Sequence, residues 1–166
     1  MRTTPTGLTL AVLILPLSLA RAEALDATAN PGEILVATIH AQGAQVYECK
    51  ADASKRLSWQ FREPIATLLV DGKTVGRHYA GPTWELAEGG TITAKVTARA
   101  PGATGNDIPH LELEVTSRRE AGQLSGVTTI RRLNTKGGVA GAPCERAGMF
   151  FSAPYSADYA FYKKND

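Results

Sequence analysis

The amino-acid sequence predicts a single all-β domain, an antiparallel β-sandwich or partly open barrel of about nine strands. Apolar and polar side chains alternate with a period of two in one segment after another, as in strands that have one buried and one solvated face. Turn signals separate these segments at intervals of about 8–14 residues, and helical spacing is nowhere sustained. This combination favours a sandwich or barrel over alternating strands and helices.

The first predicted hairpin lies near the start of the domain. Segments 35–39 and 45–49 have the composition of strands, and Ala41-Gln42-Gly43 between them is interpreted as the turn that joins them. We therefore expect two separate strands before residue 50.

The most regular short strand follows. Leu57, Trp59 and Phe61 alternate with polar residues, so these large side chains are expected to face the core. A second hairpin is predicted at Asp71-Gly72, because Asp-Gly favours the positive φ angles of a tight turn. Its two strands are segments 65–70 and 74–79.

The second half of the domain continues the alternation. In segment 91–100, Ile92, Ala94, Val96 and Ala98 form the apolar side, and Arg99 falls on the polar side. Further strands are predicted at 84–86, 111–115 and 127–133.

A closing C-terminal strand is indicated by a series of aromatic residues. Tyr155, Tyr159 and Phe161 share one parity and are expected to point inward. Tyr162 and Phe151 are then the candidates for exposed aromatic side chains.

The first 22 residues have the pattern of a secretory signal peptide. Arg2 gives a positive start, residues 8–19 form an apolar run too short to span a bilayer, and Ala20-Arg21-Ala22 places small residues at the first and third positions before the cut. Cleavage is therefore expected between Ala22 and Glu23. The protein is expected to be secreted or periplasmic, with no membrane span after cleavage.

The predicted organisation has three parts: a signal peptide at 1–22, a flexible leader at 23–32 and an all-β domain at 33–166. The leader is polar and ends in Asn30-Pro31-Gly32, a turn signal.

The charge of the mature chain argues against a nucleic-acid partner. The sequence has 18 basic and 16 acidic residues. The signal peptide contains Arg2 and Arg21 and no acidic residue, so 18 − 2 leaves 16 of each sign. The expected partner is an unknown small ligand, or another protein of the envelope or extracellular space, rather than a polyanion.

The two cysteines of the mature chain, Cys49 and Cys144, are predicted to form a disulfide. Export places them in an oxidising compartment, where such a pair is commonly joined. The alternative is a pair of buried, unlinked thiols.

Several motifs are similar to those of domain-of-unknown-function family 3455, an uncharacterised secreted family. The resemblance extends over nearly the whole mature chain. It implies secretion, one domain and a paired Cys49 and Cys144, and it implies no activity. The motifs are Val46-Tyr47-Glu48-Cys49, Trp59-Gln60-Phe61, residues 75–85, Ile108-Pro109, Thr135-Lys136-Gly137-Gly138, Cys144 and residues 154–159.

The candidate ligand-binding residues are His78, Tyr79, Trp84, Glu85 and Arg132. Four of them lie around Gly81-Pro82, and loops that place aromatic side chains beside titratable groups are common binding surfaces. The competing structural interpretation makes this segment a tight corner with Trp84 in the core.

Three functional hypotheses remain open from the sequence. The first is a non-enzymatic exported protein that binds a small ligand or a partner. The second is a small secreted hydrolase or lyase, with His78 as general base and Glu85 or Asp158 as the carboxylate that orients it. The third is a structural surface protein without a ligand.

No cofactor or metal is predicted. His40, His78 and His110 are widely separated in sequence, whereas zinc sites usually draw at least two ligands from one local segment. Glycine-rich nucleotide-binding motifs are also absent from the sequence.

Overall fold

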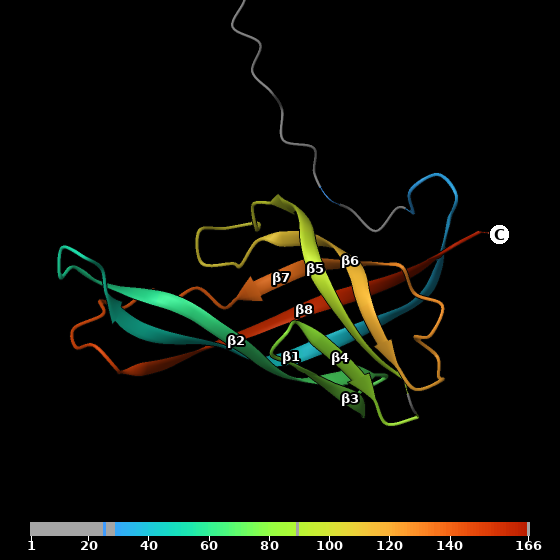
Figure 1. Ribbon diagram of the computed structural model, residues 1–166, viewed down its shortest axis with the longest axis horizontal. Helices are drawn as coiled ribbons and strands as arrows, with labels where there is room; N and C mark the ends of the chain where they lie inside the picture. The colour runs from blue at the N-terminus through green and yellow to red at the C-terminus, as the bar shows by residue number, and fades with distance from the viewer. Residues whose placement is uncertain (1–24, 26–28, 89, 166) are drawn as a thin grey trace, which may run out of the picture.

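The computed structural model describes residues 25, 29–88 and 90–165, which form eight antiparallel strands (Figure 1). They are β1 (Glu33–Ala51), β2 (Leu57–Val70), β3 (Lys73–Tyr79), β4 (Thr83–Leu86), β5 (Thr91–Ala100), β6 (His110–Arg119), β7 (Thr129–Gly137) and β8 (Phe150–Lys164). Each strand pairs with its neighbours in sequence, and β1 also pairs with β8, so the sheet closes into a barrel.

The predicted all-β, antiparallel, single-domain fold is confirmed, and the architecture is a closed barrel rather than a sandwich or a partly open barrel. The described segments contain no helix long and apolar enough to cross a membrane. The predicted signal peptide, and its cleavage site between Ala22 and Glu23, lie outside the described residues.

The predicted first hairpin is wrong, because β1 continues through Gly43 as one strand. Gly43 pairs with Ala66 on β2 and Tyr155 on β8. A Cβ atom at Gly43 would overlap the Ile65 carbonyl oxygen and lie 2.5 Å from the Ala66 Cα. The glycine therefore permits close approach of two backbones rather than a turn.

The segments predicted as two strands around Pro64 are also one continuous strand, β2. Its register with β1 shifts between Val46 and Tyr47, which marks a β-bulge. The three longest strands, β1, β2 and β8, extend beyond the others at the left of Figure 1. Leu57 and Phe61 lie in this extension and are 36 % and 54 % exposed, so the expectation that these two side chains face the core is wrong.

The hydrophobic core is one cluster inside the barrel. It includes cavity-lining residues such as Trp84 and Leu113, and Leu124 and Val127, between β6 and β7, are completely buried in it with Leu68 and Phe161. Tyr155, Tyr159 and Phe161 all belong to this core cluster, as the parity of the C-terminal strand predicts.

A second apolar cluster lies on the outer face of the sheet. Leu133, Ala160 and Tyr162 are buried, and Leu25 and Ala29 pack against them. Tyr162, a candidate for exposure from its parity, is therefore buried, because the N-terminal residues cover this face.

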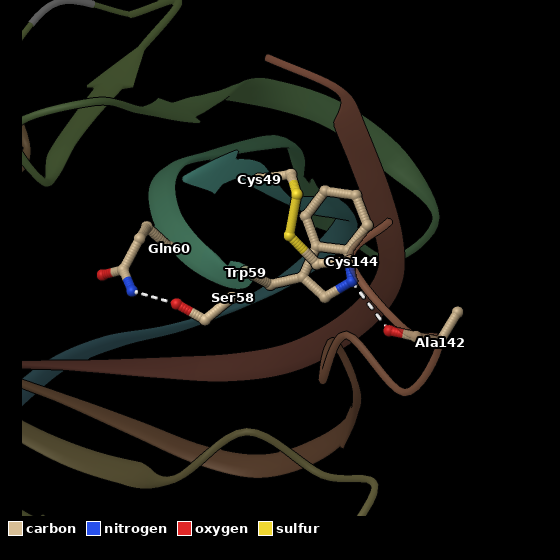
Figure 2. The surroundings of a disulfide bond; sticks show 6 residues. All are labelled: Cys49, Ser58, Trp59, Gln60, Ala142 and Cys144. Carbon is tan, nitrogen blue, oxygen red and sulfur yellow. Dashed lines mark hydrogen bonds between the residues drawn. A yellow bond between two sulfur atoms is a disulfide. The ribbon is translucent and has the colours of Figure 1, made fainter. Parts of the chain in front are cut away.

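The predicted disulfide joins Cys49 of β1 to Cys144 in the segment between β7 and β8 (Figure 2). The Trp59 indole lies beside the disulfide, and its Nε1–H donates to the Ala142 carbonyl oxygen at 2.7 Å. The backbone N–H of Cys49 also donates to the Met149 carbonyl oxygen at 2.8 Å. Residues 138–149 are therefore attached to the extended end of the barrel at several points.

Replacing Gly43 by alanine is expected to lower the free energy of unfolding by about 2 kcal/mol or more, because the new Cβ meets backbone atoms that cannot rotate away. Urea denaturation measures the change. Gly105→Ala is the matched control, since a Cβ there has nothing within 4 Å. Equal stabilities of the two variants would contradict the close approach.

Reducing the disulfide is expected to lower the free energy of unfolding by about 2–5 kcal/mol, since the bond links residues separated by 95 positions. The comparison is urea denaturation with and without a dithiol reductant. The double variant Cys49→Ala, Cys144→Ala should be equally stable in both conditions. An unchanged wild-type midpoint on reduction would rule out a stabilising disulfide.

Candidate ligand-binding cavity

A cavity of about 560 Å³ lies inside the barrel, toward the end occupied by Pro109. It extends from exposed residues, among them Phe61 and Arg99, to the buried His78 and Trp84. The other lining residues are Gln45, Tyr47, Arg62, Pro64, Gly81, Pro82, Val96, Ile108, Pro109, Leu111, Leu113, Arg132 and Tyr159. None of these described lining residues is Asp or Glu.

Arg132 reaches the cavity because of the register of β7. It pairs with Leu111 on β6 and with Tyr159 on β8, and directly opposed residues of antiparallel strands point to the same side of the sheet. Its neighbour Arg131 points the other way and forms an ion pair with Glu112 at 3.0 Å. The side chain of Arg132 therefore faces the barrel interior, and that of Arg131 faces the outside.

Arg132 is buried, with an exposure of 8 %, yet no carboxylate of the described residues lies within ion-pair distance of its guanidinium. Its Nε and Nη2 atoms both donate to the Pro109 carbonyl oxygen, at 3.1 and 2.9 Å. A neutral carbonyl does not balance the charge, and a buried charge without a counter-ion is costly. An anion in the cavity would supply that counter-ion.

His78 lies at the inner end of the cavity and is held by contacts on two sides. Its ring stacks on Trp84 with centroids 4.4 Å apart, and its Nδ1–H donates to the Thr83 carbonyl oxygen at 2.8 Å. Burial lowers the pKa of His78 to about 4, and the nearby positive charge of Arg132 contributes in the same direction. The imidazole is therefore neutral at neutral pH.

Tyr79 and Glu85 lie on the outer face of the sheet, away from His78 and Trp84. Glu85 accepts hydrogen bonds from Arg77 at 2.9 Å and from the Tyr79 hydroxyl at 2.9 Å. These two donors hold the pKa of Glu85 below its usual range. The segment forms a hairpin of β3 and β4 with a short turn rather than a long loop. Because successive side chains of a strand point to opposite faces, Tyr79 and Glu85 face outward while His78 and Trp84 face inward.

The structure thus brings three of the five predicted binding residues to the cavity, namely His78, Trp84 and Arg132. Tyr79 and Glu85 are adjacent in space to one another but do not line the cavity.

Neither carboxylate of the hydrolase hypothesis is hydrogen-bonded to His78 within the described residues. Glu85 is on the outer face, and Asp158 accepts from His40 at 2.8 Å and from Asn134 at 2.8 Å. His78 Nδ1 is directed at a backbone carbonyl instead. The pairing of an imidazole with an orienting carboxylate, which that hypothesis requires, is therefore not formed here.

Metal ligands do not cluster in the described part of the chain, where no group of three His, Cys, Asp or Glu side chains is placed to hold an ion.

Several buried hydrogen-bond donors in or next to the cavity wall have no partner of normal geometry. Within the described residues they are Gln45 Nε2, Trp84 Nε1 and the hydroxyls of Tyr155 and Tyr159. Tyr155 is not a lining residue, but it lies near Gln45 and Tyr159. Burial raises the pKa of both tyrosines, so both keep their protons. Each of the four groups can donate, and unpaired buried groups are rare in folded proteins. The cavity region is therefore rich in donors, and none of its described lining residues is a carboxylate.

Sequence reasoning missed Gln45, Tyr159 and Arg99 as cavity residues. The alternation in segment 91–100 assigns Arg99 to the solvated side, but a register shift between Val96 and Ala98 moves it to the side of Val96. A β-bulge leaves no mark in a simple alternation of polar and apolar residues, so no signal in the pattern indicates this change.

Among models of protein families, the chain matches one described as "Protein of unknown function (DUF3455)". The matched residues are 30–74 and 69–163, which together cover most of the chain. Comparisons with curated proteins and with solved structures give no match.

The lowered pKa of His78 predicts a loss of stability in mild acid. In the unfolded chain a histidine takes up a proton near pH 6.5, whereas His78 in the barrel stays neutral down to about pH 4. The unfolded state therefore binds more protons than the folded state in this window, so the free energy of unfolding decreases as the pH falls. Between about pH 7.5 and pH 5 the loss should be about 2 kcal/mol.

Urea denaturation of the wild type and of His78→Gln at the two pH values measures this loss. His40 and His110 are present in both proteins, so their contributions cancel. The wild type should lose more stability than the variant by the stated amount. An equal loss in both proteins would show that His78 is not the group responsible.

Proposed function

The chain belongs to the DUF3455 family of proteins of unknown function, and from that starting point we propose that it is an exported, non-enzymatic protein that binds a small organic anion inside its barrel. The ligand has an apolar body and an acidic head group that pairs with Arg132. This proposal places binding in the interior rather than on the turn between β3 and β4.

The observation that carries the proposal is the buried positive charge of Arg132 in a cavity without a lining carboxylate. Arginine presents a rigid array of N–H donors that matches carboxylate or phosphate oxygens. One carbonyl oxygen, that of Pro109, occupies Nε and Nη2, and the guanidinium has further N–H groups. An anionic head group would satisfy these donors and neutralise the charge.

The size and lining of the cavity support a ligand with an apolar body. A volume of about 560 Å³ lies within the range of small-molecule sites, about 300–1,000 Å³. Aliphatic surface is provided by Val96 of β5, by Leu111 and Leu113 of β6, and by Ile108 in the segment between these strands. Eight-stranded barrels are wide enough to hold one small ligand.

Export to the periplasm or the medium is part of the proposal. The N-terminal pattern of residues 1–22 supports it, and the Cys49–Cys144 disulfide is of the kind that persists in oxidising compartments.

The test is a panel of carboxylates with aliphatic and aromatic bodies, each compared with its primary amide by isothermal titration calorimetry. A carboxylate such as 2-naphthoate should bind about tenfold or more tightly than the matched amide, because only the carboxylate forms a charge-assisted pair with Arg132. Arg132→Met should abolish that preference.

Arg77→Gln is the matched control, since it removes the same charge from the outer face, where Arg77 pairs with Glu85 at 2.9 Å. It should leave the preference unchanged. If no carboxylate of the panel binds, or if carboxylates and amides bind equally to the wild type, the proposal is wrong.

A further inference from the structure

We propose that Arg99 is a second anion-recognising residue of the cavity, and that Arg99 and Arg132 together select a dianionic head group over a monoanionic one. The inference rests on the proposed function, and it specifies the class of head group that the cavity prefers.

The register of three neighbouring strands places the two arginines on one wall. Arg99 of β5 pairs with Leu111 of β6, and Leu111 in turn pairs with Arg132 of β7. Residues opposed in this way point to the same side of an antiparallel sheet, and all three line the cavity. Arg99 and Arg132 therefore flank Leu111 at one level of the barrel interior.

The spacing of the strands brings both guanidinium groups within reach of one bound group. Neighbouring strands lie about 4.8 Å apart, so the Cα atoms of Arg99 and Arg132 are separated by about 10 Å. The Pro109 carbonyl oxygen accepts hydrogen bonds from Arg132. The residue after it, His110, pairs with Ala100, which directly follows Arg99. The Arg132 guanidinium is thus held toward the end of β5 at which Arg99 lies.

Arg99 has no hydrogen bond or ion pair to any described residue through its side chain, and it is exposed at the cavity mouth. Arg62, another arginine of the lining, differs in this respect. It pairs with Glu63 at 3.1 Å and lies over the Phe150 ring. Arg99 is therefore the lining arginine, besides Arg132, whose charge is not matched by a neighbouring carboxylate in the described structure.

Two unmatched positive charges on one wall favour a ligand group that carries two negative charges. A monoanion neutralises one guanidinium and leaves the other without a counter-ion. A phosphate monoester carries close to two negative charges above pH 7 and offers three acceptor oxygens, enough for both arginines. The ligand class that this geometry favours is an apolar body with a dianionic head group.

The matched probes are 2-naphthyl phosphate and 2-naphthyl sulfate, which have the same body and similar shapes but differ in charge near pH 8. Titration calorimetry on the wild type should show about tenfold tighter binding of the phosphate. Arg99→Gln should reduce this ratio to about one while the sulfate still binds. Arg77→Gln, on the outer face, should keep the full ratio.

The outcomes separate this inference from the proposed function. If both probes bind the wild type equally, and Arg132→Met weakens both, the role of Arg99 is wrong while anion binding stands. If neither probe binds while a carboxylate of the panel does, the inference is wrong and the proposed function stands. If binding of the probes does not depend on Arg132, both proposals are wrong. A phosphate preference that survives in Arg99→Gln also overturns the inference, because another group then supplies the second charge.

Discussion

The pairing of β1 with β8 closes the sheet into a barrel, and the interior with its cavity exists because of this closure. This pairing joins the first and last strands along fifteen residue pairs, from Glu33 with Lys164 to Glu48 with Phe150. Without it, two long edge strands would expose unpaired backbone N–H and C=O groups. With it, the barrel has an enclosed interior, and alternation along each strand directs side chains to the interior or to the surface. The separation of Arg132 from Arg131, and of His78 from Tyr79, follows directly.

The interior that closure creates is divided between two kinds of environment. One contains close-packed apolar side chains, including Leu68, Leu124 and Phe161, which stabilise the barrel by removing apolar surface from water. The other contains Arg132 and unpaired donors around a cavity. A folded protein retains such unsatisfied polar groups at a cost in stability, and functional sites are where that cost is most often found. This contrast is the physical basis for assigning ligand binding to the cavity.

The sequence was sufficient for the fold class because period-two alternation reports directly on strands with two unlike faces. It also identified the disulfide and three cavity residues, His78, Trp84 and Arg132. It failed where the backbone departs from regularity. Gly43 has the composition of a turn but serves close packing, and the bulge before Arg99 inverts the face that alternation predicts. Closure itself could not be predicted, because it depends on a pairing between residues more than 100 positions apart.

A crystal structure of the protein with 2-naphthoate bound would show whether an anion binds to Arg132 inside the barrel. We expect electron density for the ligand in the cavity, with a carboxylate oxygen within about 3 Å of an N–H group of Arg132 and the ring against the aliphatic wall of β5 and β6. A ligand bound only on the outer face, or inside the barrel with its carboxylate directed away from Arg132, would contradict the proposed function.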